Sequence, residues 1–440
     1  MPGLGPLSSK NMQNQHKSVP ALTFMQAYVK SPTNLMFSHA EIGVLRAIHR
    51  LETPTRSAIA GAAGLSTVSV TSLLSGLLAR GLVVRAGKAP STGGRPCVIY
   101  GPGPRIGYTV GVFLEAGVCH LVAIDASGAV LLEQQAPVEL SEAPVDRGAE
   151  IVNGISGQVA RLQADPTLRG RRLLAVGVTP PGMVDTKRGL WLHGLRLSGI
   201  EHVRLGTLLE AALGVPVLVE DGARCLAHLA LIRLGRDQAG DLLLVYLGSG
   251  VGAGLAMNGE LFHGHRGLAG EIGHLIVEER GERCGCGNSG CLETVASVPA
   301  ILRRFQRLLD EGVISRLREK ELTLEGIGEA AASGDRIALN GLAQIGASLG
   351  EACGKSILLF NPCTLLIAGP VAALGDYLKE TLWARVRQQV IPEMLEDLSL
   401  QFLPSRPGDE GMGAASLASQ WFWDRRAADG RVPELEEVFS

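Results

Sequence analysis

The sequence predicts an α/β protein in which a small, mainly helical domain precedes a larger body of two lobes around a cleft. Residues 104–425 alternate apolar stretches of strand length with amphipathic helical stretches, which is typical of an α/β body, and roughly 320 residues of this kind are expected to divide into two lobes. Residues 39–103 follow a different, mainly helical pattern. Charge divides the chain near the same place. Residues 1–100 carry ten Lys and Arg and two acids, a net charge of +8. Because the whole chain has a net charge of −2, the remaining residues carry −10.

The bulk composition indicates a compact, folded protein with a part that binds polyanions. Of the 440 residues, 46% are hydrophobic and 19% are charged, which provides for two or three domains with cores of their own and excludes a disordered chain. The basic block favours a module that binds a polyanion. Glycines and charges interrupt every apolar stretch well short of the roughly 20 residues that a membrane span needs, and the N-terminus lacks the apolar core of a secretory signal. We therefore expect a cytoplasmic protein with no membrane partner.

Both ends of the chain are expected to be flexible tails. Residues 1–38 are rich in Ser, Asn, Gln and Pro and lack a clear hydrophobic period, apart from one short predicted helix near Leu22–Val29. Residues 426–440 are assigned to a C-terminal tail.

Residues 39–103 contain the elements of a winged helix-turn-helix. Apolar residues recur at helical spacing in three stretches, near 42–49, 56–63 and 67–80. Gly64 and Gly81 end the second and third of these helices, and Ser66 is a good N-cap for the third. Two stretches of strand character, Leu82–Val84 and Cys97–Tyr100, follow and are joined by a polar Gly/Pro loop. This order of three helices and a two-stranded wing is typical of a DNA-binding domain.

The third helix is predicted to be the one that reads DNA. Its apolar residues are expected to face the core: Leu65, Val70, Leu73, Leu74, Leu77 and Leu78. Four hydroxyl side chains remain on the outer face near the helix N-terminus, where a recognition helix meets base edges: Thr67, Ser69, Thr71 and Ser72. Arg56 and Lys88 are the expected phosphate contacts. A three-helix interaction domain would share the helical pattern, but not the wing.

The wing loop carries a candidate minor-groove contact. It reads Ser91-Thr92-Gly93-Gly94-Arg95-Pro96. In an extended Gly-Arg-Pro segment, the guanidinium of Arg95 can lie along the narrow minor groove of A·T-rich DNA. Taken alone, the tripeptide is more often a turn, and its place after a winged helix is what favours the DNA contact.

The larger body contains six predicted buried strands separated by amphipathic helices. They are Val110–Phe113, Leu121–Ile124, Leu173–Val178, Val215–Val219, Leu242–Leu247 and Leu365–Ala368.

Within this body, one histidine and three cysteines match a structural zinc site. His274 is followed, after nine residues, by Cys284, Cys286 and Cys291 in a glycine-rich loop. Three thiolates and one imidazole complete a tetrahedral zinc shell and leave no position for water, so the metal is expected to be structural. The alternative is a set of free or redox-active thiols.

These motifs resemble those of the ROK family (repressor, open reading frame, kinase), which contains sugar kinases and sugar-responsive repressors. The resemblance rests on Gly248-Ser-Gly-Val-Gly-Ala-Gly254, on Gly270-Glu-Ile-Gly-His274, and on the cysteine loop that ends in Cys291-Leu-Glu293. It runs from about residue 39 to residue 425 and includes the winged helix. It implies an actin-like, sugar-kinase-like (ribonuclease H-like) body for residues 104–425, with the zinc loop at 274–293.

The resemblance also assigns roles to individual residues. It implies that His274, Cys284, Cys286 and Cys291 hold the zinc. It implies that Glu271, His274 and Glu293 bind sugar hydroxyls, and that Asp221 matches the catalytic base of the kinases, with Glu220 in the preceding sugar-binding position. The alternative for each acid is a solvated surface carboxylate.

Two departures from the family pattern argue against kinase chemistry. Phe113 stands where the kinases have the Asp of their first phosphate motif, and Glu115 puts a negative charge where phosphate would sit. The later glycine cluster is reduced to Ala368-Gly369-Pro370. Phosphoryl transfer is therefore expected to be lost, which leaves no catalytic residue and makes Asp221 vestigial. The Gly248–Gly254 run alone does not argue for ATP, because close packing of a turn also needs glycine.

The sugar site departs from the pattern as well. Glu220-Asp221 replaces the Asn-Asp pair of the family, and His193-Gly194-Leu195 replaces its Pro-Asn-Leu loop. Either the sugar preference is altered, or the pocket has lost its ligand.

The sequence therefore predicts a repressor, as a homodimer or homotetramer, that binds an A·T-rich, pseudo-palindromic DNA operator and responds to a sugar or sugar derivative. The zinc loop, next to the ligand, is the expected relay. One alternative is an active sugar kinase with a DNA-binding appendage, which ADP release would identify. The other is a constitutive regulator, which a sugar screen without a ligand would favour.

Overall fold

The computed structural model describes residues 37–89, 96–115, 117–141, 146–194, 197, 199–235, 240–319, 321–403, 406 and 408–429. The short helix predicted near Leu22–Val29, the wing residue Arg95 and the end of the C-terminal tail lie outside these residues.

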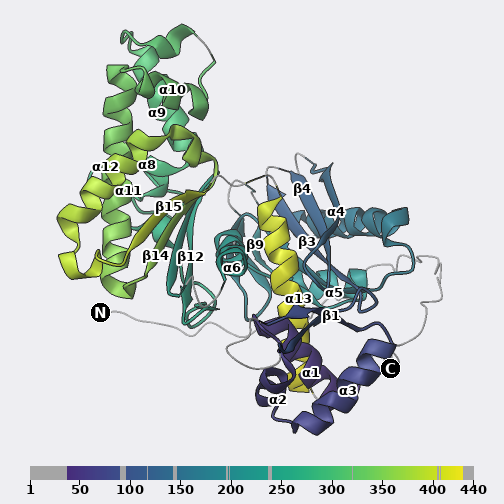
Figure 1. Cartoon of the computed structure of the whole chain (residues 1–440). Helices are drawn as coiled ribbons and strands as arrows, with labels where there is room; N and C mark the ends of the chain where they lie inside the picture. Colours follow the sequence, from purple (N-terminus) through teal and green to yellow (C-terminus); the bar gives the residue numbers. More distant parts are fainter. Residues whose placement is uncertain are drawn as a thin grey trace, which may run out of the picture. The chain divides into compact units, whose positions relative to one another are not determined.

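The first described domain is a winged helix-turn-helix, as predicted (Figure 1). Its elements are α1 (His39–Arg50), α2 (Arg56–Ala63), α3 (Thr67–Ala79), β1 (Val83–Lys88) and β2 (Val98–Pro102). Ser38 and Glu41 form a capping box at the start of α1. Gly64 ends α2 in the left-handed conformation, at φ 64°, and Ser66 caps α3 by accepting a hydrogen bond from the amide of Ser69 at 3.1 Å. Val70, Leu74 and Leu77 of α3 are buried, whereas Leu65, Leu73 and Leu78 are half-buried.

The first lobe is built on a five-stranded sheet in the order β10-β6-β3-β4-β5. Its elements are β3 (Tyr108–Glu115), β4 (Val118–Asp125), β5 (Val130–Pro137), α4 (Arg147–Gln163), the 3₁₀ turn η1 (Pro166–Leu168), β6 (Leu173–Thr179), β7 (Gly182–Asp185), β8 (Leu190–Gly194), β9 (Glu201–Val203), α5 (Leu205–Leu213) and β10 (Val217–Val219). Each predicted strand of this region is present. Strands β3 and β6, together with α4, supply one continuous hydrophobic core.

The second lobe contains another five-stranded sheet, in the order β13-β12-β11-β14-β15. Its elements are β11 (Leu242–Leu247), β12 (Val251–Met257), β13 (Glu260–Leu261), η2 (Ile272–His274), α8 (Glu293–Ala296), α9 (Val298–Asp310), η3 (Arg316–Glu319), α10 (Leu324–Ala332), α11 (Arg336–Phe360), β14 (Thr364–Ala368), η4 (Pro370–Leu374), α12 (Asp376–Gln389), η5 (Pro392–Met394) and β15 (Ser399–Leu403). The long helix α11 packs against α12, and both contribute to the core of this lobe.

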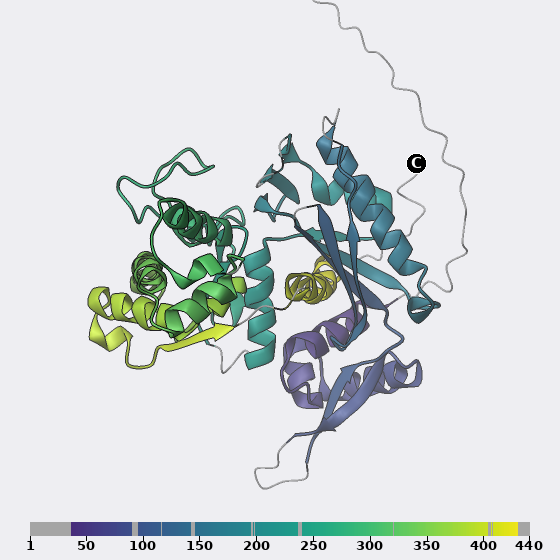
Figure 2. The ribbon, with the colours of Figure 1, turned by 90° about the horizontal axis from the view of Figure 1, so that it is seen from above.

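Two further helices connect these parts. Helix α6 (Gly222–Leu234) packs against β11 and β12, and α13 (Asp409–Asp429) returns to the first lobe, where it contacts β3, β6, α6 and α1 (Figures 1 and 2). The backbones approach very closely here. A Cβ at Gly111 would collide with the carbonyl oxygen of Gly411, and one at Gly177 with that of Ala414. Glycine is therefore required in β3 and β6 for α13 to lie on the sheet.

Among the described helices, none is by itself both long and apolar enough to cross a membrane, although α2 and α3, which meet at a bend of 108°, reach that length and composition together.

Candidate functional site

A cavity of about 600 Å³ brings together most of the residues predicted to bind a ligand. The strand ends and turns around it supply Phe113 and Glu115 from β3, and Ser249 from the turn between β11 and β12. Four of the five predicted ligand residues line it: Asp221, Glu271, His274 and Glu293. These acids are therefore not dispersed surface carboxylates.

Asp221 lies between β10 and α6 and caps the helix. Its carboxylate accepts a hydrogen bond from the amide of Arg224 at 3.1 Å. Burial raises the pKa of Asp221 above its ordinary value, against the lowering effect of the Arg224 guanidinium. The cap fixes the orientation of the carboxylate toward the cavity that it lines.

Glu220 is the exception among the predicted ligand residues, because it does not line this cavity. Its side chain is 1% exposed and is held by the Nε of Arg224 at 2.7 Å, by the Nε2 of His263 at 2.9 Å and by the hydroxyl of Thr186 at 2.9 Å. Burial alone would raise the pKa of Glu220, but the charge of Arg224 and the hydrogen bond from His263 outweigh it and bring the pKa to about 2. Arg224, four residues later on α6, holds this carboxylate outside the cavity, so Glu220 does not line the site to which the sequence assigned it.

Glu271, His274 and Glu293 form the opposite wall. The Nε2 of His274 lies 3.9 Å from the Glu271 carboxylate, and Glu293 accepts a hydrogen bond from the amide of Val251 at 3.2 Å. Burial raises the pKa of Glu271 to about 7, and the nearby charges of Asp221 and Glu293 add to this effect. Around neutral pH, Glu271 can therefore either donate or accept a hydrogen bond.

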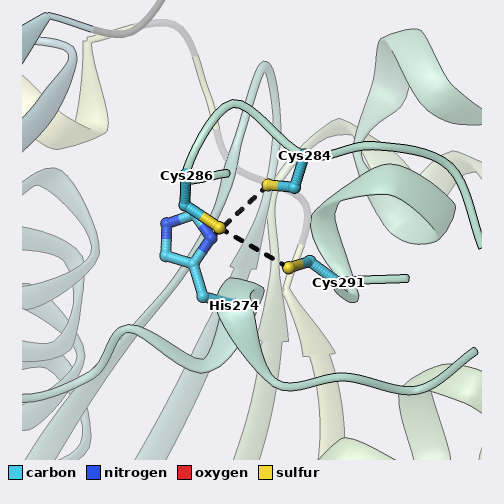
Figure 3. Close-up of side chains that lie close together, drawn as sticks. All are labelled: His274, Cys284, Cys286 and Cys291. Atoms are coloured by element: carbon cyan, nitrogen blue, oxygen red, sulfur yellow. Dashed lines mark hydrogen bonds between the residues drawn. The ribbon is translucent and has the colours of Figure 1, made fainter. Parts of the chain in front are cut away.

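The other nitrogen of His274 faces the cysteine loop. Its Nδ1 lies 3.6 Å from the Sγ of Cys284, and the Sγ atoms of Cys286 and Cys291 are 3.7 Å apart. All four donor atoms lie within 4.8 Å of one another and point toward a common centre (Figure 3). A tetrahedron with metal–sulfur bonds of about 2.3 Å has edges of about 3.8 Å, so this cluster could hold a metal ion.

One residue that lines the cavity, and its partner behind the wall, were not singled out from the sequence. Tyr246, on β11, lines the cavity and is hydrogen-bonded to Glu410, in the first turn of α13. A Cβ at Gly248 would collide with the Tyr246 hydroxyl. Burial raises the pKa of Glu410 to about 7, and the negative charge of Glu115 adds to this. These two residues are 164 positions apart, so no local pattern in the sequence could have paired them.

The predicted DNA-contacting residues within the described part of the chain are all exposed. Thr67, Ser69, Thr71 and Ser72 of α3 are exposed, as are Arg56 and Lys88. Val68, which the sequence analysis missed, is 79% exposed on the same helix. Helical spacing could have found it, because Val68 and Ser72 are four residues apart and therefore share a face. Arg95 stays a prediction.

The winged helix is attached to the body through α1 and the end of α13. Asp424 accepts hydrogen bonds from Arg46 at 2.7 Å and from Arg50 at 2.8 Å. The Trp423 ring stacks on His49, with 5.4 Å between ring centroids, and meets Phe37 edge-on. Burial lowers the pKa of His49 to about 4, so its ring is neutral at neutral pH. Phe37, assigned to the tail from the sequence, is therefore part of this junction.

Comparisons with known proteins agree with these features. The model of the ROK family matches residues 111–421. NagC, a DNA-binding transcriptional dual regulator of Escherichia coli (strain K12), is 33% identical over 349 residues, which cover 79% of this chain and 84% of NagC. A crystal structure of a ROK-family transcriptional regulator, a homologue of the E. coli Mlc protein, matches with a TM-score of 0.74 and 25% identity over 89% of this chain and 99% of that one. A ROK-family glucokinase from Streptomyces griseus, in complex with glucose and AMPPNP, matches with a TM-score of 0.58 and 27% identity over 71% of this chain and 100% of that one.

Proposed function

Because the chain belongs to the ROK family, we propose that it is a DNA-binding transcriptional repressor whose affinity for its operator is controlled by a sugar or sugar derivative in the interlobe cavity. The observation that carries this proposal is α13. One end of this helix contributes Glu410 beneath the cavity, and the other holds α1 of the winged helix through Trp423 and Asp424. A ligand that favours one position of α13 would therefore also favour one position of the DNA-binding domain.

The DNA contacts follow from the exposed surface of the winged helix. The hydroxyls of Thr67, Ser69, Thr71 and Ser72 would face the major groove, together with the Val68 methyl groups. Arg56 and Lys88 would contact phosphates, and Arg95 the minor groove of A·T-rich DNA. Two winged helices of a homodimer, or of a dimer of dimers, would occupy successive half-sites of a pseudo-palindrome.

The metal cluster is proposed to hold a structural zinc ion. Three thiolates and one imidazole favour zinc over calcium or magnesium, which prefer oxygen ligands, and four protein ligands leave no open coordination position. Zinc thiolates and eight cysteines without a disulfide fit a reducing cytoplasm. The metal would fix the His274 ring, so that Nε2 stays directed toward Glu271 and the ligand.

Kinase activity is proposed to be absent. Phe113 and Glu115 line the cavity where the family resemblance puts the nucleotide phosphates, and the Tyr246–Glu410 pair lies at the same end. A triphosphate there would meet negative charge without a basic partner among the described lining residues. Asp221 would then orient a sugar hydroxyl without activating it for transfer.

The proposal is tested with the full, zinc-loaded chain and a random duplex library. Repeated selection should enrich A·T-rich pseudo-palindromes, and a panel of sugars should contain one that changes the affinity for the selected duplex at least tenfold. A coupled assay should detect no ADP release with ATP and any sugar of the panel. Enrichment of no sequence would contradict the DNA-binding role, and robust sugar-dependent ADP release would contradict the loss of catalysis.

Arg56→Ala provides a matched check of the DNA contacts. It should weaken binding to all duplexes alike. It should also reduce the slope of the logarithm of the binding constant against the logarithm of the salt concentration by about one, because one phosphate contact is lost. Thr71→Ala should instead change which bases are selected. If both variants behave as the wild type, α3 does not lie in the major groove.

A further inference from the structure

We propose that the effector is an amino sugar with a free, positively charged amine and no phosphate; this rests on the proposed function, in which the cavity binds a sugar. The ligand class follows from the acidic groups that line the cavity and from the absence of a basic partner among its described lining residues.

The ionisable groups of the cavity wall are mainly acidic. Its acidic side chains are those of Glu115, Asp221, Glu271 and Glu293, and no lysine or arginine of the described residues lines it. Glu271, whose pKa is raised to about 7, carries only part of a negative charge at neutral pH. Cys286 of the metal loop also lines it, and a zinc ion with three thiolates and one neutral imidazole carries a net charge of −1. The wall therefore attracts cations and repels anions.

The nearest arginine offsets this charge only in part. Arg224 is 2% exposed and donates to the Glu220 carboxylate, to the carbonyl of Ala269 at 2.7 Å and to Thr186 at 3.4 Å. The carboxylate that accepts its side-chain hydrogen bond is Glu220, which does not line the cavity, although the charge of Arg224 also favours the ionised forms of Asp221 and Glu271. No arginine or lysine among the described residues pairs with Glu115 or Glu271.

The two ends of the cavity have different chemistry. At one end, Asp221 and Glu293 already accept backbone hydrogen bonds, and together with Glu271 and His274 they present oriented acceptors for hydroxyl groups. We assign the other end to Glu115 and Tyr246, which also line the cavity; the charge of Glu115 contributes to the raised pKa values of Tyr246 and of Glu410 behind the wall. A sugar ring fits the first end, and a cationic substituent on that ring fits the second.

This arrangement separates three kinds of sugar. A sugar phosphate or sugar acid brings a second anion next to fixed carboxylates in a partly buried cavity, which is strongly unfavourable. A neutral sugar desolvates Glu115 without replacing the lost water by an opposite charge. An ammonium group supplies that charge and donates up to three hydrogen bonds to carboxylates.

The experiment is a calorimetric titration of the full, zinc-loaded chain at neutral pH with matched sugars. Glucosamine, mannosamine and galactosamine are each compared with the parent hexose, the N-acetyl derivative and the 6-phosphate. At least one amino sugar should bind at least tenfold more tightly than the parent hexose and the N-acetyl derivative. The 6-phosphate of that amino sugar should bind more weakly than either of them. The preference should shrink as the salt concentration rises.

Two variants identify the source of the preference. In Glu115→Gln, the ratio between amine and hexose affinities should fall below threefold, whereas Glu115→Asp should restore most of it. Glu325→Gln, at an exposed position in the first turn of α10, removes the same charge outside the cavity and should keep the wild-type ratio. A ratio that is unchanged in Glu115→Gln would overturn the assignment of the cationic end.

The outcomes distinguish this inference from the proposed function. Binding of a hexose, an N-acetyl sugar or a phosphate as tightly as the amine overturns the ligand class and leaves the sugar-controlled repressor intact. Tight binding of an amine without any effect on operator affinity supports the ligand class and contradicts the control of DNA binding. If no sugar of the panel binds, the ligand class is wrong.

Discussion

The two lobes repeat one sheet and use it for different purposes. In each lobe, two antiparallel pairings are followed by two parallel ones, so that β5-β4-β3-β6-β10 corresponds to β13-β12-β11-β14-β15. The first sheet is covered by α13 and carries the junction with the winged helix. The second lobe carries the metal loop.

The equivalent hairpin turns of the two sheets differ in their residues. The β3–β4 turn begins at Glu115, whereas the β11–β12 turn is Gly248-Ser249-Gly250. The glycine run that begins in the second turn continues into β12, where packing requires Gly254: a Cβ there would lie 2.6 Å from the carbonyl oxygen of Ala223 and would collide with Ala227. Retained glycines are therefore compatible with the loss of nucleotide binding, and the acidic first turn is the informative one.

The largest effect is expected from the metal loop of the second lobe. Cys291→Ser should abolish stoichiometric zinc binding and cost more than about 4 kcal/mol of unfolding free energy, because a buried ligand of a closed metal site is lost. Metal analysis and thermal melting measure both quantities. Cys97→Ser, at an exposed cysteine outside the cluster, is the control. Full zinc content in Cys291→Ser would refute the metal assignment.

The next effect separates the two hairpins. Gly254→Ala should destabilise the protein by about 3 kcal/mol, because the added methyl group would clash with Ala223 and Ala227 of α6. Gly117→Ala, in the β3–β4 turn, has no atom closer than 3.8 Å to the added Cβ and should cost only the strain of its positive φ of 80°, about 1 kcal/mol. Denaturant unfolding compares the two, and equal losses would contradict the packing role of Gly254.

A smaller, pH-dependent effect is expected where α13 meets the cavity. The pKa of Glu410 is raised from 4.5 to about 7, so the folded state holds this proton more tightly than the unfolded state, and stability falls as pH rises through 7. Between about pH 5.5 and pH 8 the loss is about 2 kcal/mol from this group. Glu410→Gln should remove that loss, since the amide oxygen can still accept from Tyr246. Parallel pH profiles for variant and wild type would contradict the burial argument.

The smallest effect concerns the attachment of the winged helix to the first lobe. Asp424→Asn weakens two hydrogen bonds to arginines that are more than a third exposed, so the expected loss is about 0.5 kcal/mol and should vanish at high salt. Asp397→Asn, at an exposed position in the second lobe, is the control for charge. A loss of several kcal/mol would mean that the ion pairs, rather than Trp423 and His49, hold the junction.

Local signals in the sequence predicted much of this structure. The caps at Ser66 and Gly64, and the alternation of strands and helices, depend on neighbouring residues and were confirmed. The convergence of His274 with three cysteines was also predictable, since the spacing within a glycine-rich loop restricts where the thiols can lie. The two equivalent sheets were not predicted, because their pairing depends on contacts between distant segments.

The hydrogen-bond and ion-pair partners of the buried carboxylates were harder to predict from the sequence. Glu220 was expected to bind the ligand because it takes the place of the Asn in the Asn-Asp pair of the family, yet Arg224 and His263 hold its side chain outside the cavity. The spacing of four residues between Glu220 and Arg224 was a local signal for this pair. His263 is 43 residues away, so its contact depends on the path of the chain and could not be predicted locally. The same holds for Tyr246 and Glu410, whose segments meet only when α13 returns to the first lobe.

That return has a consequence for biosynthesis. Strands β3 and β6 and helix α1 are complete before residue 180, but the helix that covers both strands and holds α1 spans Asp409–Asp429. At a translation rate of about 5–20 residues per second, the face of the sheet that α13 covers stays exposed for on the order of 12 to 50 s. A ribosome that stops before residue 409 releases a DNA-binding domain without the helix that holds it.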